Sequence, residues 1–344
     1  MPDLNEPVPA DDLHAVASAF RLGAIDEISY LPTGLMNRNW RLATEQGVWA
    51  LKHITDVPLA TARRNLRAVI ALHADGVPAC PPRLTTEDDP VLQLNERGYC
   101  VLPWINGTHP TGPELSLDQT HELGAALGRI HDTLQRCAPT TGLPAPVTRP
   151  TARTIHPDTA IAQANRYQAA ALAANSGPFD EQAIELLDHR KLLINKHSSE
   201  RPTDDNPRGP FGWTHGDLQH RNVIWQDGRI TAVIDWDRIR VRPYAEEVAR
   251  TATIQFSHAD GLDLRRVTAF VTGYRTIVPL NGADLADGVH RLWWKRMSDF
   301  WHLDYHYDRG DHGCDDLFLT GETFLDWWTT HREDVQHAFA AALP

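Results

Sequence analysis

Residues 213–237 constrain the fold of this chain more than any other stretch. Two apolar runs rich in β-branched residues, 223–225 and 230–234, stand on either side of Asp227-Gly228. An Asp-Gly pair between two such runs is a strong signal for a two-residue turn that joins antiparallel strands. The sequence therefore predicts a short β-hairpin here.

The predicted hairpin also indicates where its polar side chains lie. With a two-residue turn, Gln226 faces Arg229 and Asn222 faces Val233. Side chains alternate between the two faces of a strand, so Asn222 and Asp235 would share one face. Such diagonal neighbours lie about 7–8 Å apart at the backbone, so both oxygens could reach one magnesium ion.

The spacing of polar residues around the hairpin matches a known chemistry. Four residues separate Asp217 from Asn222, as between the Asp and the Asn of the kinase catalytic loop. In that chemistry one Asp receives the proton of the attacking hydroxyl, while the Asn and a second Asp hold magnesium. We therefore predict Asp217 as the catalytic residue and Asn222 and Asp235 as metal ligands. The alternative is a polar hairpin whose Asp and Asn only stabilise turns.

Two motifs in this stretch resemble the aminoglycoside phosphotransferase and choline kinase superfamily. They are His-Gly-Asp-x-x-x-x-Asn at 215–222 and Ile-Asp-Trp-Asp at 234–237. Gly216 stands where protein kinases have Arg. A helix expected at 245–252 follows almost at once, which leaves little room for the activation segment on which protein kinases dock peptides. The resemblance therefore favours a small-molecule acceptor.

The resemblance implies an α+β, two-lobed fold similar to that of protein kinases. We expect a small β-rich ATP-binding lobe at 1–102, a hinge at 103–107 and a larger, mainly helical lobe at 108–344. The helical lobe would hold the catalytic hairpin, 213–237, and acceptor-binding helices at 262–344.

Local patterns give the expected elements. Ser116 and Gln119 predict a capping box at the start of a helix over 115–135. Further helices are expected at 10–22, 63–74, 160–175 and 180–196, and strands at 27–31, 39–44, 48–54 and 99–102. The segments 138–160 and 197–210 are expected to be irregular, and the polar, Pro-rich composition of the second predicts a mobile loop.

A loop between two expected strands is the candidate phosphate-covering loop. It spans Thr33 to Trp40, and the resemblance implies Gly34, Asn37 and Asn39 as nucleotide-binding residues. The alternative is an ordinary turn, because one glycine falls far short of G-x-G-x-x-G. The chain has no G-x-x-x-x-G-K sequence, which disfavours a P-loop kinase.

Lys52 resembles the lysine that contacts the α- and β-phosphates in this superfamily. It ends the run Trp49-Ala50-Leu51-Lys52, where burial without an anionic partner would be costly. The alternative is an edge-strand lysine that faces solvent. The helix that usually offers a glutamate to this lysine has no acidic residue from 57 to 74, and Asn65 aligns with that glutamate. Either another carboxylate pairs with Lys52, or the phosphates alone balance its charge.

The expected hinge offers backbone groups to the base of the nucleotide. By resemblance, the Ile105 amide would donate to adenine and the Pro103 carbonyl would accept from it. Proline lacks an N–H but keeps its carbonyl, so Pro103 is a suitable acceptor. A hinge made of backbone groups also leaves GTP possible as the donor.

The C-terminal third is rich in aromatic and acidic residues. It includes Trp293, Trp294, Trp301, Tyr305, Tyr307, Trp327 and Trp328, interleaved with Asp299, Asp304, Asp308, Asp311, Asp315 and Asp316. Aromatic faces beside carboxylates suit a cationic acceptor. The alternative is that the tryptophans form a core and the aspartates a solvated loop. His302, His306, His312 and Cys314 suggest a metal site, but chance pairing among 18 histidines is the favoured explanation.

Composition narrows the possible partners. Against 33 Lys and Arg stand 45 Asp and Glu, a formal charge of −12, which argues against nucleic-acid binding. The four cysteines are scattered, as expected of reduced thiols. No apolar run is long enough for a membrane span, so we expect a cytoplasmic protein. The sequence carries no signal for the oligomeric state.

Together these observations predict an ATP- and Mg²⁺-dependent phosphotransferase that acts on a hydroxyl of a small polar metabolite or antibiotic. One alternative is a kinase of Ser or Thr hydroxyls in peptides. The other is a catalytically silent nucleotide-binding protein, which rests on the missing glutamate near Asn65.

Overall fold

The computed structural model describes residues 8–32, 37–174, 177–258 and 261–341. The chain forms two compact units. The first comprises residues 1–110, 126–147 and 212–240, and the second comprises residues 111–125, 148–211 and 241–344. The first unit thus contains both the N-terminal sheet and the hairpin. The lobe boundaries expected from the sequence stay a prediction.

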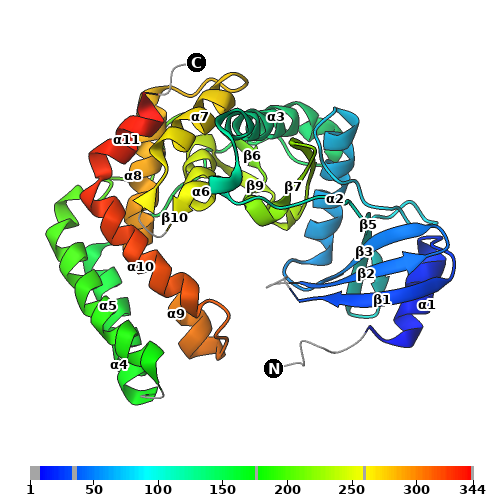
Figure 1. The fold of residues 1–344 in the computed structure, drawn as a ribbon, viewed down its shortest axis with the longest axis horizontal. Coiled ribbons are helices and arrows are strands. Elements are labelled where there is room, and N and C mark those ends of the chain that lie inside the picture. Colours follow the sequence, from blue (N-terminus) through cyan, green and yellow to red (C-terminus); the bar gives the residue numbers. More distant parts are fainter. Residues whose placement is uncertain (1–7, 33–36, 175–176, 259–260, 342–344) are drawn as a thin grey trace. The chain divides into compact units, whose positions relative to one another are not determined.

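The first unit is built on a five-stranded antiparallel sheet (Figure 1). Its strand order is β1-β2-β3-β5-β4. The strands are β1 (Ile25–Leu31), β2 (Arg38–Thr44), β3 (Gly47–Ile54), β4 (Leu92–Leu94) and β5 (Arg97–Pro103). The predicted strands are confirmed, with β5 longer than expected and β4 unexpected.

Helices bury the apolar side chains of this sheet. Trp40, Leu42 and Leu51 share a core cluster with Val16 and Phe20 from the α1 segment (helix Ala10–Ala19). A second cluster joins β3 and β5 to α2 (Leu59–Ala74), which begins four residues earlier than expected. Alternation of apolar and polar residues along the strands thus supplies the sheet's buried face.

An ion pair anchors α1 to β5. The Asp12 carboxylate accepts a hydrogen bond from Arg97 Nε at 2.6 Å and one from the Tyr99 hydroxyl at 2.7 Å. The side chain of Asp12 is almost fully buried. Hydrogen bonds from Arg97 lower the Asp12 pKa, although burial opposes them. The carboxylate therefore stays charged inside the unit.

The hairpin consists of β7 (Val223–Gln226) and β8 (Arg229–Val233). Thr108, just after the expected hinge, exchanges two backbone hydrogen bonds of 2.9 Å with Trp225. On the other strand, Ala79 forms a parallel bridge with Val233. These contacts fix the hairpin within the same unit as the sheet.

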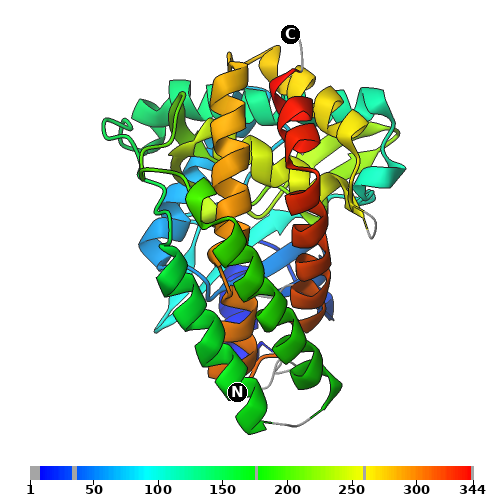
Figure 2. The same ribbon diagram turned by 90° about the vertical axis from the view of Figure 1, so that its left-hand side faces the viewer.

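The second unit is mainly helical (Figure 2). Its helices are α4 (Pro157–Ala174), α5 (Pro178–Lys196), α6 (Tyr244–Phe256), α7 (Leu264–Arg275), α8 (Gly282–Ser298), α9 (Trp301–Leu303), α10 (Asp315–Thr330) and α11 (Arg332–Ala340), with a π-helical turn, η5 (Asp304–Asp308). The α4 and α5 helices lie side by side, and α6 and α11 pack on α8. Trp293, Trp294 and Trp328 are fully buried, so these aromatic residues belong to the core.

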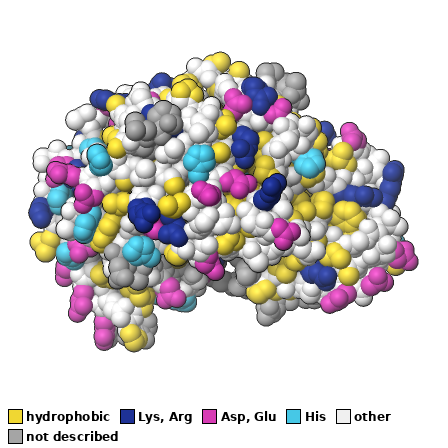
Figure 3. Space-filling view, turned by 45° about the horizontal axis from the view of Figure 1, so that its top comes forward, with side chains coloured by type: hydrophobic (Ala, Val, Ile, Leu, Met, Phe, Trp, Pro, Cys, Tyr) yellow, Lys and Arg dark blue, Asp and Glu magenta, His cyan; other side chains and the backbone are white. Residues whose placement is uncertain are grey.

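The remaining elements complete the chain. They are α3 (Leu117–Thr141), β6 (Phe211–Thr214), β9 (Arg240–Pro243), β10 (Ser257–His258) and β11 (Gly261–Leu262), with the short 3-10 helices η1 (Gly112–Glu114), η2 (Ser198–Glu200), η3 (His220–Asn222) and η4 (Trp236–Arg238). The capping box before α3 is confirmed, because Ser116 and Gln119 exchange hydrogen bonds of 2.9 and 3.1 Å. Within the described residues, the helices are each too short or too polar to cross a bilayer. Basic and acidic side chains are interspersed on the face in Figure 3.

Candidate active site

The turn of the hairpin forms as the sequence predicts. Asp227 and Gly228 both have positive φ, 50° and 77°. A two-residue turn with positive φ at both positions matches the right-handed twist of the strands it joins. Gln226 pairs with Arg229 directly across the turn, as expected.

Beyond the turn the predicted register is wrong. Trp225 pairs with Ile230 and Ile224 with Ala232, so the intervening Thr231 is an extra residue. This bulge shifts the ladder by one position, because two residues of one strand then oppose one of the other. Val223, not Asn222, consequently faces Val233.

Because of the bulge, the alternation of side chains no longer places Asn222 and Asp235 on one face of the hairpin. The Asn222 carbonyl accepts a hydrogen bond of 2.9 Å from the Ile234 amide, so Asn222 neighbours Ile234 across the ladder. Asp235 then leaves the strand in a left-handed conformation, with φ 61° and ψ 65°. Its side-chain direction is therefore set by this turn, not by the pleat of β8.

The loop before the hairpin holds Asp217 through its backbone. The Asp217 carbonyl accepts a hydrogen bond of 2.8 Å from Asn222 Nδ2. Because the amide nitrogen of Asn222 is used in this way, its Oδ1 is the atom suited to a metal ion. Gln219 Nε2 donates to Asp217 Oδ2 at 3.3 Å. The predicted base and the predicted amide ligand are thus joined directly.

Gly216 is required by its surroundings. Its φ is 86°, and a Cβ at this position would lie 2.1 Å from the Arg238 carbonyl oxygen. A side chain would therefore clash with backbone that cannot move aside easily, in addition to the strain of the left-handed conformation. This close approach explains the glycine between His215 and Asp217.

His215 links the two sides of the site, a role that the sequence did not reveal. Its buried ring has Nε2 3.1 Å from the Ile234 carbonyl oxygen and Nδ1 3.2 Å from the Asp217 amide. Because the Asp217 amide donates to Nδ1, the hydrogen of the ring lies on Nε2, which donates to the Ile234 carbonyl. The ring also packs on Trp236. His215 thus holds the Asp217 loop against the strand that leads to Asp235.

Lys52 of β3 lies between two carboxylates. Its Nζ is 2.8 Å from Asp235 Oδ1 and 2.7 Å from Asp237 Oδ2. Burial by itself would lower the Lys52 pKa, but the charges of Asp235 and then Asp237 outweigh burial and raise it above its ordinary value. Burial likewise opposes the charged form of Asp235, yet Lys52 holds the Asp235 pKa below its usual range. Lys52 and Asp235 are therefore both charged at neutral pH.

These contacts decide between the two alternatives for Lys52. Another carboxylate does pair with it, although helix α2 has no acidic residue. Asn65, where the glutamate was expected, is buried and donates from Nδ2 to the carbonyl oxygens of Trp236 (3.1 Å) and Asp237 (2.9 Å). Asn65 Oδ1 in turn accepts from Arg64. The asparagine therefore positions the backbone that carries the lysine's partner.

The described part of the predicted phosphate loop contacts the same segment. Asn37 Nδ2 donates to Asp237 Oδ2 at 2.8 Å, and its Oδ1 accepts from the Thr55 amide at 3.0 Å. Asn39 stands directly opposite Lys52 in the β2–β3 ladder, so the two side chains share one face of the sheet. Gly34 lies outside the described residues.

The expected hinge borders a cavity of about 450 Å³. The cavity is lined by Pro103, Ile105, Cys80, Ala79 and Ala232, among other residues. The Cys80 thiol donates to the Pro103 carbonyl at 3.6 Å. A carbonyl oxygen has two lone pairs, so Pro103 can accept from an adenine amino group as well.

The sequence model of the phosphotransferase enzyme family matches residues 27–279, which include the sheet, the expected hinge and the hairpin. The chain belongs to the phosphotransferase enzyme family. A homoserine kinase of Janthinobacterium sp. (strain Marseille) is 22% identical over 304 residues, covering 86% of this chain and 87% of the relative.

Solved structures agree with a kinase-like fold for this phosphotransferase. Amicoumacin kinase, in complex with AMP-PNP and Ca²⁺, has a TM-score of 0.61 at 16% identity, covering 91% of both chains. A spectinomycin phosphotransferase with ADP and spectinomycin also has a TM-score of 0.61 at 16% identity, covering 98% of this chain and all of the other. A choline kinase from Cryptosporidium parvum has 0.56 at 10% identity, covering 97% and 98%. The predicted fold class and superfamily are confirmed.

The site of this phosphotransferase thus combines predicted and unforeseen residues. Contacts run from Lys52 to Asp235, and from Ile234 through His215 to Asp217 and Asn222. Asp237 and Asn65 were not predicted in their observed roles. The second Asp of the Ile-Asp-Trp-Asp motif was the available signal for Asp237, because an acidic residue so close to Asp235 can reach the same lysine.

Proposed function

We propose that this phosphotransferase transfers the γ-phosphoryl group of ATP to a hydroxyl group of a small polar molecule. The observation that carries the proposal is the pairing of Lys52 with Asp235 and Asp237, beside the loop that holds Asp217 and Asn222. A buried lysine between two aspartates is costly to maintain unless it serves a purpose such as binding phosphate.

The donor atoms present fit a magnesium ion. The Asp235 carboxylate and the Asn222 amide oxygen are hard oxygen ligands of the kind that Mg²⁺ prefers. When bound, the ion would neutralise charge on the transferring phosphoryl group. Asp237 would keep Lys52 paired when Asp235 engages the metal, because Lys52 contacts both carboxylates.

The residues of the chain have separate tasks in the proposed reaction. The oxygen of the acceptor hydroxyl forms a bond to the γ-phosphorus, and the Asp217 carboxylate accepts the proton of that hydroxyl. The bond from that phosphorus to the β–γ bridging oxygen breaks, and ADP leaves. Lys52 steadies the α- and β-phosphates, while Asn39 lies on the same face of the sheet. Pro103 and Ile105 offer their backbone groups to the base.

The relatives support the proposed acceptor class. The relatives include kinases of homoserine, choline and spectinomycin, which are all small hydroxyl compounds. A small polar acceptor with an amino group also suits a chain with a formal charge of −12. We therefore propose amino alcohols and amino sugars before peptides as acceptors.

The decisive variant is Asp217→Asn, which keeps the size of the side chain and removes the base. Turnover should fall about 10²–10⁴-fold, the usual contribution of a general base, while MgATP binding is retained. Transfer is measured by mass spectrometry against homoserine, choline, aminoglycosides, spectinomycin and Ser/Thr peptides, with ATP and with GTP.

Asp227→Asn is the matched control, because it removes a carboxylate from the same hairpin and suits the left-handed turn. Control turnover should equal that of the wild type. Near-wild-type transfer by Asp217→Asn would show that another group accepts the proton. Phosphorylation of the peptides alone would replace the small-molecule acceptor by a protein substrate.

A further inference from the structure

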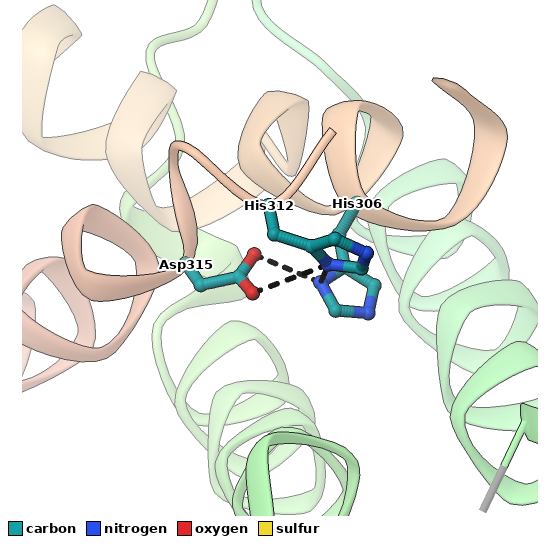
Figure 4. A group of neighbouring side chains, drawn as sticks. All are labelled: His306, His312 and Asp315. Carbon is teal, nitrogen blue, oxygen red and sulfur yellow. Dashed lines mark hydrogen bonds and ion pairs between the residues drawn. The ribbon is translucent and has the colours of Figure 1, made fainter. Parts of the chain in front are cut away.

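Three potential metal-binding side chains converge in the second unit, to which the hairpin does not belong (Figure 4). His306 belongs to η5, His312 to the loop that follows, and Asp315 begins α10. The two Nδ1 atoms lie 3.0 Å apart. Asp315 places Oδ1 2.8 Å from the Nδ1 of His306 and Oδ2 3.5 Å from that of His312.

These separations resemble the edges of a zinc coordination tetrahedron. With zinc bonds of about 2.0–2.2 Å to nitrogen and oxygen, tetrahedral donor atoms lie about 3.3–3.5 Å apart. Two imidazoles and one carboxylate form a common zinc donor set, and imidazole is a poor ligand for magnesium. The three side chains therefore need only small shifts to bind one ion.

Hydrogen bonds among these three side chains cannot satisfy all of their lone pairs when both imidazoles are neutral. A neutral imidazole carries one N–H, and a carboxylate only accepts. If the His306 Nδ1 hydrogen is donated to Asp315, the lone pair of His312 Nδ1 points into the same small space as the carboxylate charge. A cation satisfies all of these lone pairs at once.

A second carboxylate lies behind His306. Its Nε2 is 4.0 Å from Asp180 Oδ1, and Asp180 is nearly fully buried and accepts a hydrogen bond of 2.7 Å from the Tyr307 hydroxyl. Histidines that bind metal usually direct their other nitrogen toward a carboxylate or carbonyl. Phe179 stacks on the His306 ring at 4.3 Å and fixes its plane. Asp180, near Nε2, and Phe179, on the ring face, thus both orient the imidazole of His306.

The structure changes the set of residues that the sequence suggested. His302 lies near the positive charges of Arg190 and Arg296. Burial first, and then these two charges, lower the His302 pKa to about 4. Such surroundings oppose a bound cation. Among the described residues, Cys314 is also outside the group whose donor atoms lie within 4.8 Å of one another. Asp315 takes its place.

We propose that His306, His312 and Asp315 bind one divalent transition-metal ion of the zinc class, independently of the magnesium of phosphoryl transfer. A water molecule would take the fourth position, because His312 is mostly exposed. The ion would join η5 to the first turn of α10 across residues 309–314. It would thereby stabilise this part of the helical unit, since an ion that binds only the folded state shifts the folding equilibrium.

The test uses the full chain without a histidine tag, after removal of metals with a chelator. Cobalt(II) is titrated in buffer with excess Mg²⁺, and the visible absorption of tetrahedral cobalt is recorded; zinc is then added to displace it. We expect one equivalent of cobalt to bind and zinc to raise the Tm. Both signals should be lost in His312→Gln and in Asp315→Asn.

His189→Gln is the matched control. His189 lies 3.0 Å from Asp326, so it forms an exposed His–Asp pair of the same kind, but it is not part of the three-residue group. The His189→Gln variant should still bind one equivalent of cobalt. The Asp180→Asn variant should weaken zinc binding about 10–100-fold without abolishing it, as expected for a residue behind a metal ligand.

Two outcomes would overturn the proposal. One is the absence of stoichiometric cobalt or zinc binding to the wild-type protein. The other is binding that survives in the His306→Gln, His312→Gln double variant. Because His312 is mostly exposed, its single substitution should leave the fold intact, which separates loss of the metal from loss of structure.

Discussion

The two polar clusters of this phosphotransferase use opposite chemistry. The cluster in the first unit brings a lysine between two aspartates, Asp235 and Asp237, and its candidate metal ligands are hard oxygens. The cluster in the second unit joins two imidazoles to one carboxylate and lacks a lysine or arginine among its three members. The comparison teaches that oxygen ligands beside a fixed positive charge suit the proposed MgATP site, whereas imidazole nitrogens suit the softer ion proposed for the other site.

The largest expected effect comes from Asp235→Ala. It removes a proposed magnesium ligand and one partner of Lys52, so kcat should fall by at least about 10³-fold, the scale of several kcal/mol of lost charge stabilisation. Zinc binding at His312 should be unchanged. The rate of phosphoryl transfer is measured from the amount of ADP released. A parallel loss of zinc binding would mean that the two clusters are not independent.

A smaller effect is expected from Asp237→Asn. The amide can keep a contact with the Asn37 segment, but Lys52 loses the partner that would remain when Asp235 engages magnesium. We expect the KM for ATP to rise about tenfold with a lesser change in kcat, because weaker uniform binding acts on KM. Steady-state kinetics at varied MgATP concentrations measure the changes in KM and in kcat separately. An unchanged KM would assign Asp237 a purely structural role.

The smallest effect concerns stability in the first unit, outside both clusters. Because the Asp12 pKa is lowered in the folded protein, its stabilisation is complete above the ordinary Asp value and is lost as pH falls through the folded value. Asp12→Asn should therefore cost about 1–3 kcal/mol at pH 7, as for other buried hydrogen-bonded charges.

The cost of Asp12→Asn should begin to shrink below about pH 4, where the carboxylate of the unfolded wild-type chain takes up a proton, and should shrink further as the pH falls through the lowered pKa of the folded protein. Urea unfolding at pH 7 and at pH 3.5 measures both values. A cost that is equal at the two pH values would mean that the charge of Asp12 contributes nothing.

Local signals predicted the local structure of the site. The Asp227-Gly228 turn was predictable because two adjacent residues determine it, and the strands of the sheet were predictable from alternation. The bulge at Thr231 was not, since it depends on how β8 is held by backbone from other segments, including the bridge from Ala79 to Val233. The sequence thus identified the hairpin but misplaced Asn222 by one position.

Partners across the chain were less predictable. Asp237 reaches Lys52 because Asp235 adopts a left-handed conformation, which a sequence pattern does not reveal. In the suggested set of His302, His306, His312 and Cys314, only His302 and His306 have helical spacing, whereas the chain between His306 and Asp315 is a π-helical turn followed by a loop. Contacts between side chains that a turn brings together could therefore not be predicted from the sequence pattern.

The position of Asn65 has a consequence for control of the enzyme. In protein kinases, the corresponding lysine is paired by a glutamate on a movable helix, and displacement of that helix switches the enzyme off. Here both carboxylates that hold Lys52 follow the hairpin, and α2 contributes only an amide to their backbone. Displacement of α2 would therefore not remove a charged partner from Lys52, in contrast to protein kinases.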